Sequence, residues 1–332
     1  MRFLDSYNGF RSELFLKEES ERKNIKTVGL TAGICIIAYV VLNNIVSVPF
    51  MFEPLNSIYR ESSTMQLVVS IVFSIICMLI PFAIGAKVIK RKTKLVPADF
   101  SPPVSVPLML SATAFGMFIC LAGNYLSGIF IEYTQKIGFE LTAPEFPIPS
   151  DFLGRLVYFV SIAIAPPLIE EFAVRGVVMQ PLRRYGDRFA IVVSALVFAI
   201  LHGNLIQSPF AFIAGLGIGY AVCITNSLWT GILIHFCNNL YSVATALMIE
   251  DIADENLLNA VFMIVLIALY AVSILGSAIF MLLKEKRRLT PSFTVSTPMQ
   301  KGFSFFINVP MVIAILMMLK ITRDFVTFTG IK

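Results

Sequence analysis

Charged side chains are scarce in this chain and unevenly distributed. Asp, Glu, Lys and Arg supply 14% of the 332 residues, and 57% are apolar, whereas soluble proteins carry about 25% charged residues. Several stretches of about 20 residues have almost no charge, and the charges gather between them, as in a chain that crosses a bilayer repeatedly. The composition excludes an ordinary soluble protein and predicts an all-α, polytopic transmembrane helix bundle.

Two other signals are missing. The five cysteines lie in apolar stretches without CxxC spacing, so we interpret them as small buried hydrophobic residues rather than disulfides or metal ligands. No run of Lys and Arg is interleaved with aromatic residues. The net charge of +5 comes from basic residues at the ends of apolar stretches, where anionic lipid headgroups attract them. We expect a lipid bilayer as partner and no nucleic acid.

The apolar stretches predict about eight or nine spans, each near the 20 or so residues needed to cross the hydrocarbon. Their approximate limits are 28–50, 65–88, 105–131, 156–182, 189–205, 209–226, 229–249, 257–283 and 302–320. Lys and Arg concentrate in the N-terminal arm and in loops 87–94, 183–188 and 284–301, whereas loop 250–255 is acidic. Because positive loops stay cytoplasmic, we expect a multi-pass protein of the cell membrane with a cytoplasmic N-terminus and an external C-terminus.

The N-terminal arm carries an apolar stripe at helical spacing, formed by Phe3, Tyr7, Phe10 and Leu14. Such a stripe is typical of an amphipathic helix on the membrane surface. An ordinary solvated arm is the alternative interpretation.

Ionisable residues within predicted spans are costly in hydrocarbon and are functional candidates. Residues 189–249 contain no Asp, Glu, Lys or Arg, but they contain both histidines of the chain, His202 and His235. The preceding span carries Glu170, Glu171 and Arg175 in an otherwise apolar run. These five residues therefore mark the region where we expect chemistry.

Helical spacing suggests different roles for the two glutamates. Glu171 and Arg175 are four residues apart and share a helix face, so we expect them to pair and to support the fold. Glu170 points about 100° away, which leaves it free to take a proton or bind a metal. Pro166 and Pro167 lie just before, and we expect the helix to break or kink there and open a polar cavity at membrane depth.

The histidines are also paired with polar or aromatic residues at helical spacing. Phe198 precedes His202 by four residues, and Asn239 follows His235 by four, so each pair shares a helix face. A carboxylate, two imidazoles and an amide could ligate Zn²⁺ or polarise a water directly. The plainer interpretation is structural, with each histidine bonded to a backbone carbonyl and the Glu–Arg pair joining helices.

In this order the three motifs resemble the CPBP family of intramembrane endopeptidases, the CAAX-protease and bacteriocin-processing, or Abi-like, family. The family pattern is EExxxR, then FxxxH, then HxxxN. Here it reads Glu170-Glu171-Phe172-Ala173-Val174-Arg175, Phe198-Ala199-Ile200-Leu201-His202 and His235-Phe236-Cys237-Asn238-Asn239. The resemblance covers about residues 155–243.

The resemblance implies a membrane metalloendopeptidase that hydrolyses a peptide bond in a membrane-associated protein or peptide. By resemblance, Glu170 is the general base that activates water, with His202 assisting. His235 and Asn239 hold a metal or stabilise the oxyanion. Zn²⁺ is the expected cofactor, with Glu170, His202, His235 and Asn239 as the metal set and Glu171, Arg175 and Phe198 as supporting residues.

On this interpretation the chain divides into a cytoplasmic arm (1–27), N-terminal transmembrane helices (28–150), a catalytic transmembrane core (151–249) and C-terminal transmembrane helices (250–332). Two other classes compete with it. A proton-coupled transporter would also place Glu and His in the membrane, although the spans show no repeated halves. A non-catalytic immunity or binding protein would keep the fold without the hydrolysis.

Overall fold

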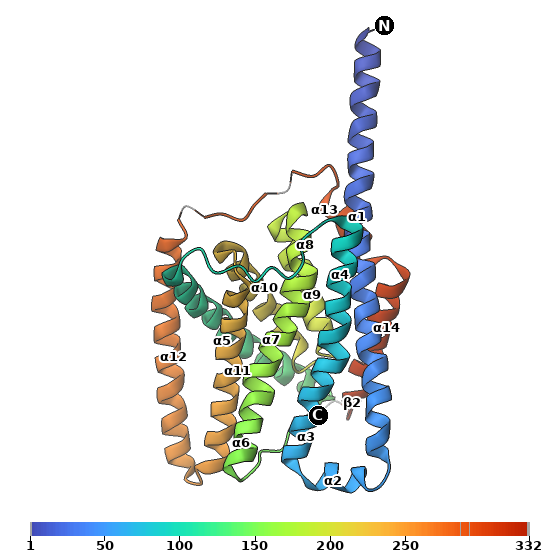
Figure 1. Ribbon diagram of the computed structural model, residues 1–332. Helices are drawn as coiled ribbons and strands as arrows, with labels where there is room; N and C mark the ends of the chain where they lie inside the picture. The colour runs from blue at the N-terminus through green and yellow to red at the C-terminus, as the bar shows by residue number, and fades with distance from the viewer. Residues whose placement is uncertain (1, 286, 292, 331–332) are drawn as a thin grey trace.

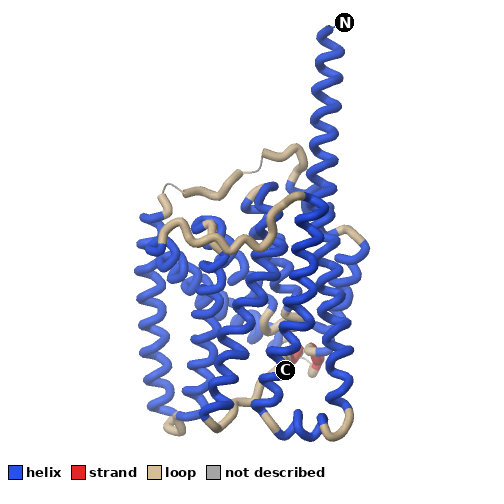
Figure 2. Tube along the Cα trace, viewed as in Figure 1, coloured by secondary structure: helices blue, strands red, loops and turns tan. Residues whose placement is uncertain are grey.

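The computed structural model describes residues 2–285, 287–291 and 293–330, with side chains from residue 13 onward. Apart from one short pair of strands, the regular structure is helical (Figures 1 and 2). The first half contains α1 (Arg2–Ser47), η1 (Val48–Met51), α2 (Leu55–Glu61), α3 (Ser63–Phe73), η2 (Ser74–Leu79), α4 (Ile80–Thr93), α5 (Val106–Lys136), α6 (Phe152–Phe159) and η3 (Val160–Ile164). The rest of the chain contains α7 (Ala165–Glu171), η4 (Phe172–Met179), α8 (Gln180–Leu182), η5 (Arg183–Tyr185), α9 (Asp187–Leu201), α10 (Ser208–Thr225), α11 (Leu228–Asp251), α12 (Glu255–Leu283), α13 (Pro298–Phe306) and α14 (Val309–Asp324). The strands β1 (Phe139–Leu141) and β2 (Val326–Phe328) pair antiparallel.

The bundle has the helix lengths and the outer surface of a multi-pass membrane protein. Seven helical stretches in the described residues are long and apolar enough to cross a bilayer, or eight if the bent pair α13–α14 counts as one span. α12 presents Ile264, Leu275 and Leu282 outward, each more than 60% exposed. Such an apolar exterior is stable against lipid and not against water. The predicted polytopic helical bundle is therefore confirmed.

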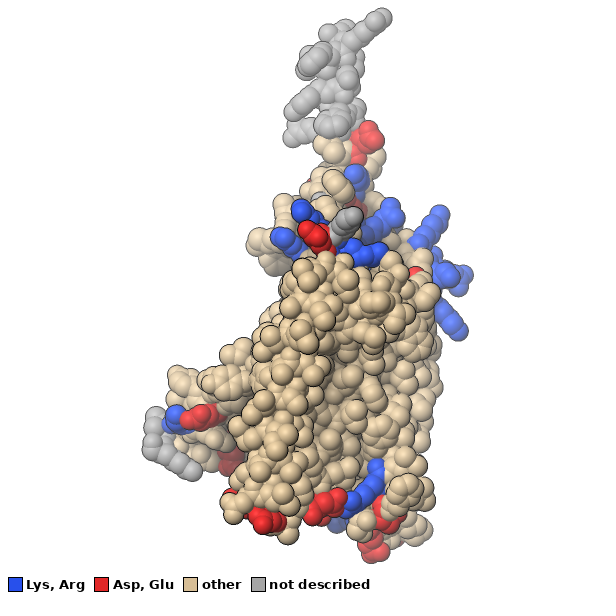
Figure 3. Space-filling model, turned by 90° about the vertical axis from the view of Figure 1, so that its left-hand side faces the viewer, with Lys and Arg blue, Asp and Glu red and all other residues tan. Residues whose placement is uncertain are grey.

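Lys and Arg predominate at one end of the bundle, whereas Asp and Glu predominate at the other, as Figure 3 shows. We call the end with the C-termini of α4 and α12 and the start of α9 the basic face; it carries Lys90, Arg91, Lys92, Lys94, Arg184, Arg188, Lys284 and Arg287. The opposite end, with α2, the start of α6 and the α11–α12 connection, is the acidic face; it carries Glu53, Glu61, Asp151, Glu250, Asp251, Asp254 and Glu255. α1 enters the bundle at the basic face (Figure 1).

Two predicted spans differ from simple crossings. The fifth, 189–205, is α9, whose 15 residues cover only about 22 Å of a hydrocarbon layer of about 30 Å. The ninth, 302–320, is the pair α13–α14, bent by 74°. The cause is local: residues 307 and 308 interrupt the helix, and the Asn308 side chain caps α14 by accepting a hydrogen bond from the Met311 amide.

α9 and α10 form an antiparallel hairpin. Close contacts join Gly215 to Ala195 and Gly219 to Ile191. Residue numbers rise along α10 as they fall along α9, so the two helices are antiparallel. The outer ends of the hairpin meet at Arg183, which bonds Asp187 at the start of α9 and Asn226 just after α10. The hairpin therefore enters and leaves at the basic face and places its turn, 202–207, at the end away from that face, with Gly203 and Asn204 buried.

The span that carries Glu170 does not end at Pro166 and Pro167. Of the predicted break or kink, the break is wrong and the kink stays a prediction. The span runs as one helical stretch from Phe152 to Tyr185, with π-helical turns η3 before α7 and η4 after it. A π turn accommodates irregular bonding without ending the helix. The prolines sit at the start of α7, directly after η3.

The N-terminal arm is not a separate element. Residues 2–47 form one continuous helix, α1, that projects beyond the bundle (Figure 1). The side chains of Phe3, Tyr7 and Phe10 lie outside the described residues, so the amphipathic stripe stays a prediction.

Candidate active site

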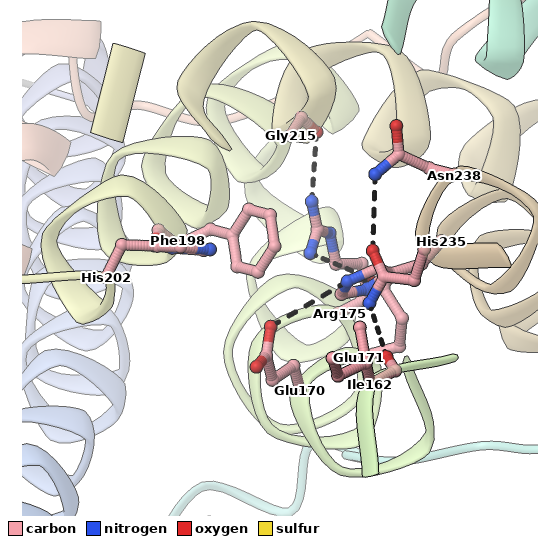
Figure 4. Close-up of polar contacts among 10 residues, drawn as sticks. Ile162, Glu170, Glu171, Arg175, Phe198, His202, Gly215, His235 and Asn238 are labelled. Atoms are coloured by element: carbon pink, nitrogen blue, oxygen red, sulfur yellow. Dashed lines mark hydrogen bonds and ion pairs between the residues drawn. The ribbon is translucent and has the colours of Figure 1, made fainter. Parts of the chain in front are cut away.

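Arg175 and Glu171 form the predicted ion pair at the centre of the bundle. Arg175 Nη1 lies 2.8 Å from Glu171 Oε1, and both side chains are fully buried. Arg175 also donates through Nη2 to the Gly215 carbonyl of α10. Its Cζ atom lies 4.3 Å from the centre of the Phe198 ring on α9. One guanidinium therefore connects η4 with the α9–α10 hairpin (Figure 4).

Glu171 also orients the second histidine, which the sequence did not predict. His235 Nδ1 lies 3.0 Å from Glu171 Oε1, the same oxygen that binds Arg175. The Glu171 carboxylate accepts a hydrogen bond from the Nδ1–H of His235, and the other ring nitrogen, Nε2, therefore faces away from Glu171. The ion pair thus sets the tautomer and direction of an imidazole on α11.

Glu170 lies on the other side of that imidazole. Its Oε2 is 3.9 Å from His235 Nε2, and its side chain is 26% exposed. Two acceptors that bind one water at about 2.8 Å each lie about 4 to 4.5 Å apart. The observed 3.9 Å is slightly shorter than this separation, so a single water that donates one hydrogen to each acceptor fits after a small widening of the gap.

His202 is held by the other helix of the site. Its Nδ1 lies 2.8 Å from the Phe198 carbonyl, and because a carbonyl only accepts, Nδ1 carries the proton and Nε2 has the free lone pair. The Phe198 ring packs edge-on against both imidazoles, with centroid distances of 4.8 Å to His202 and 5.7 Å to His235. Phe198 therefore separates and positions the two histidines, as Figure 4 shows.

Asn239 bonds a backbone carbonyl that Pro166 and Pro167 leave without an amide donor. The Ile162 carbonyl would accept from residue 166 in an α turn or from residue 167 in a π turn, and both are prolines without an amide proton. Asn239 Nδ2 fills this place with a hydrogen bond of 2.8 Å to Ile162 O, and its Oδ1 accepts from Asn238 at 3.2 Å. The second hydrogen on Asn239 Nδ2 remains free to donate.

All four predicted residues, Glu170, His202, His235 and Asn239, line one cavity of about 610 Å³. The other lining residues include Ser70, Ser74, Asn124, Ser127, Pro144, Phe146, Ser161, Gln207, Asn238 and Ser242. The turn of the α9–α10 hairpin reaches the cavity through His202 and Gln207. The structure therefore brings together side chains that lie up to 69 residues apart in sequence, from Glu170 to Asn239.

The donors agree with zinc in type but not in spacing. A carboxylate and two imidazole Nε2 atoms are the ligands that Zn²⁺ prefers. However, no group of three or more His, Cys, Asp or Glu side chains within the described residues is arranged to hold a metal ion. Zinc binding remains a prediction, and the chemistry below uses only the side chains of this chain.

Gly231 belongs to the site and was missed. A Cβ at this position would lie 2.9 Å from Glu171 Oε2 and 2.9 Å from the Val222 side chain. Gly231, His235 and Asn239 are successive members of an i, i+4, i+8 series, so they share the face of α11 that meets α7. The GxxxHxxxN spacing was the signal in the sequence.

Together, the helices and the cavity define a multi-pass membrane protein with a carboxylate, two imidazoles and an amide around a polar space at membrane depth. Residues 152–241, which are 90 of the 332, match the family model described as type II CAAX prenyl endopeptidase Rce1-like. The match confirms the resemblance to the CAAX-protease-like family indicated by the three motifs and supports an intramembrane protease in general. The searches of curated proteins and of solved structures found no match.

Proposed function

We propose that this protein is an intramembrane endopeptidase that hydrolyses a peptide bond in a membrane-associated protein or peptide. One observation carries the proposal: Glu170 faces a cavity with His235 Nε2 at a distance suited to one shared water. Peptide hydrolysis requires an activated water and a donor for the developing oxyanion. Both requirements have candidate groups here.

In the proposed reaction, Glu170 takes a proton from the bound water, whose oxygen attacks the peptide carbonyl. His235 Nε2 accepts the water's other hydrogen bond and so directs its lone pair, while Glu171 and Arg175 hold the ring. The free N–H of Asn239 donates to the carbonyl oxygen as charge develops on it. Glu170 then returns the proton to the leaving amine, so that water is consumed and two peptide ends are released. His202, on the far wall, assists by accepting a hydrogen bond from substrate or water.

The decisive experiment compares membranes that contain the unmodified protein with membranes that contain Glu170→Gln. This substitution keeps the shape and removes the base, so we expect a rate loss of at least about a hundredfold and an unchanged melting temperature. Proteomics should reveal peptides that arise only with the unmodified protein. Glu250→Gln, at the exposed acidic face, is the matched control and should retain full cleavage. Cleavage by Glu170→Gln at the normal rate would exclude the proposed mechanism and favour a binding or transport function.

Zinc is tested separately. Metal analysis of purified protein should find about one zinc per chain if the predicted cofactor is present, and Glu170→Gln with His235→Ala should lose it. Full cleavage by protein that contains no zinc would instead support the metal-free water activation described above.

A further inference from the structure

The cavity extends from the candidate catalytic residues toward the acidic face. α11 begins at the basic face with Leu228 and ends at the acidic face with Asp251. Along it, the lining residues His235, Asn239 and Ser242 lie about 10, 16 and 21 Å from Leu228, at 1.5 Å per residue. The chemistry therefore sits nearer the basic face, while the cavity continues the other way.

Elements that start at the acidic face line the same side of the cavity. α3 contributes Ser70, and η2, which continues it, contributes Ser74. They lie about 10 and 16 Å from the first residue of α3. Pro144 and Phe146 belong to the connection that leads to the start of α6 at this face, and both are exposed. The mouth of the cavity is thus lined by Pro144 and Phe146 of the 142–151 connection, with Ser70 of α3 and Ser242 of α11.

Between the candidate catalytic residues and the basic face the helices are tightly packed. The residues that follow Arg175 on the same span, the middle of α9, the end of α10 and the start of α11 are buried. They include Val177, Val178, Met179, Leu182, Val193, Val197, Ala221, Val222, Ile224, Leu228 and Ile234. None of the cavity-lining residues belongs to the described loops of the basic face. Buried side chains at this packing density leave no passage for a peptide between them. A second, apolar cavity of about 610 Å³, lined by Pro103, Val106, Pro167, Trp229 and Phe236 among others, reaches the start of α11 but shares no lining residue with the cavity of Glu170.

The walls of the open side suit a peptide backbone. The Ser127 hydroxyl and the Asn238 side-chain oxygen line the cavity, are buried, and have no hydrogen-bond partner in the described part of the chain. Buried polar atoms without partners are costly, and the amide groups of an extended peptide would satisfy them. Water would do so in the resting protein.

We infer that the substrate reaches Glu170 from the side of the acidic face, as an extended peptide segment that enters past Pro144, Phe146 and Ser242. The part about a peptide rests on the proposed function, whereas the position of the mouth does not. If the basic face is cytoplasmic, the scissile segment is presented on the external side of the membrane.

The test is thiol labelling in sealed vesicles with a charged thiosulfonate that does not cross the bilayer. Single substitutions Ser74→Cys, inside the cavity, and Phe146→Cys, at its mouth, are compared with Lys92→Cys on the basic face and Glu250→Cys on the acidic face. The unsubstituted protein gives the background, because four native cysteines are buried and Cys237 is half-buried. Labelling after denaturation shows that each new thiol is present.

We expect Ser74→Cys and Phe146→Cys to react from the side that labels Glu250→Cys, with little reaction from the side that labels Lys92→Cys. Reaction of Ser74→Cys from the Lys92→Cys side, or from neither side, would overturn the inference. The same labelling in a Glu170→Gln background requires no catalysis. If labelling follows the expected pattern but no proteolysis is found, the position of the mouth is supported and the protease function is contradicted. If proteolysis is found but labelling comes from the other side, the function is supported and the position of the mouth is contradicted.

Discussion

At the scale of single residues, the two adjacent glutamates have different surroundings. Glu171 is fully buried and contacts Arg175, His235 and Gly231, whereas Glu170 faces the cavity. The difference follows from the 100° turn between neighbouring helix positions, which directs one side chain into the helix interface and the other toward an opening. One glutamate builds the site and the other is available for chemistry.

Removing Arg175 should harm the fold as well as the activity. Arg175→Ala leaves the Glu171 carboxylate buried without its cation, at a cost of about 3–5 kcal/mol, and frees His235 to turn. We expect less folded protein and a lower melting temperature in detergent. Arg184→Ala, an exposed arginine nine residues later, should behave like the unmodified protein. Normal abundance and melting of Arg175→Ala would contradict the structural role of the pair.

At the scale of elements, close helix contacts position the site. α7 carries both carboxylates and η4 carries Arg175. The α9–α10 hairpin carries His202 and Phe198, and α11 carries His235 and Asn239. Glycines let these helices approach: Gly215 and Gly219 contact α9, and Gly217 contacts Ile119 of α5. Small residues serve this purpose in membranes because association there depends on packing.

Gly231 offers a sharp test of these contacts. Glycine to alanine in an exposed helix normally stabilises by about 0.5–1 kcal/mol. At Gly231 the added methyl group meets Glu171 and Val222, so we expect Gly231→Ala to displace Glu171, turn His235 and lower the cleavage rate by about tenfold or more, with no gain in stability. Gly302→Ala is the control, because a Cβ there meets nothing within 4 Å. Equal rates for the two variants would show that Glu171 does not orient His235.

At the scale of the whole molecule, charge is sorted between the two faces while the cavity opens toward only one. Positive residues remain cytoplasmic during insertion, which favours a cytoplasmic basic face and N-terminus. The α9–α10 hairpin enters from that face and supplies His202 at membrane depth. The orientation in cells is therefore a prediction that also decides from which compartment the substrate comes.

In intact cells, a thiol reagent that cannot cross the membrane should label Glu250→Cys and spare Lys92→Cys until the cells are permeabilised. The expectation follows from the charge difference between the faces, since each of the clustered basic residues resists translocation. Immediate labelling of Lys92→Cys in intact cells would reverse the predicted orientation. It would leave the cavity mouth on the acidic face and move the substrate to the cytoplasm.

The sequence alone determined the helical membrane class, the Glu171–Arg175 pair and the membership of Glu170, His202, His235 and Asn239 in one group of polar residues, because charge scarcity and helical spacing are local properties. Only the tertiary structure decided that Glu171 also holds His235, that Asn239 bonds the Ile162 carbonyl left free by two prolines, and that α9 turns back with α10 instead of crossing. It also decided that the cavity extends toward the acidic face. These features depend on contacts between helices far apart in the chain, and a helix period specifies which face is polar without specifying what that face meets.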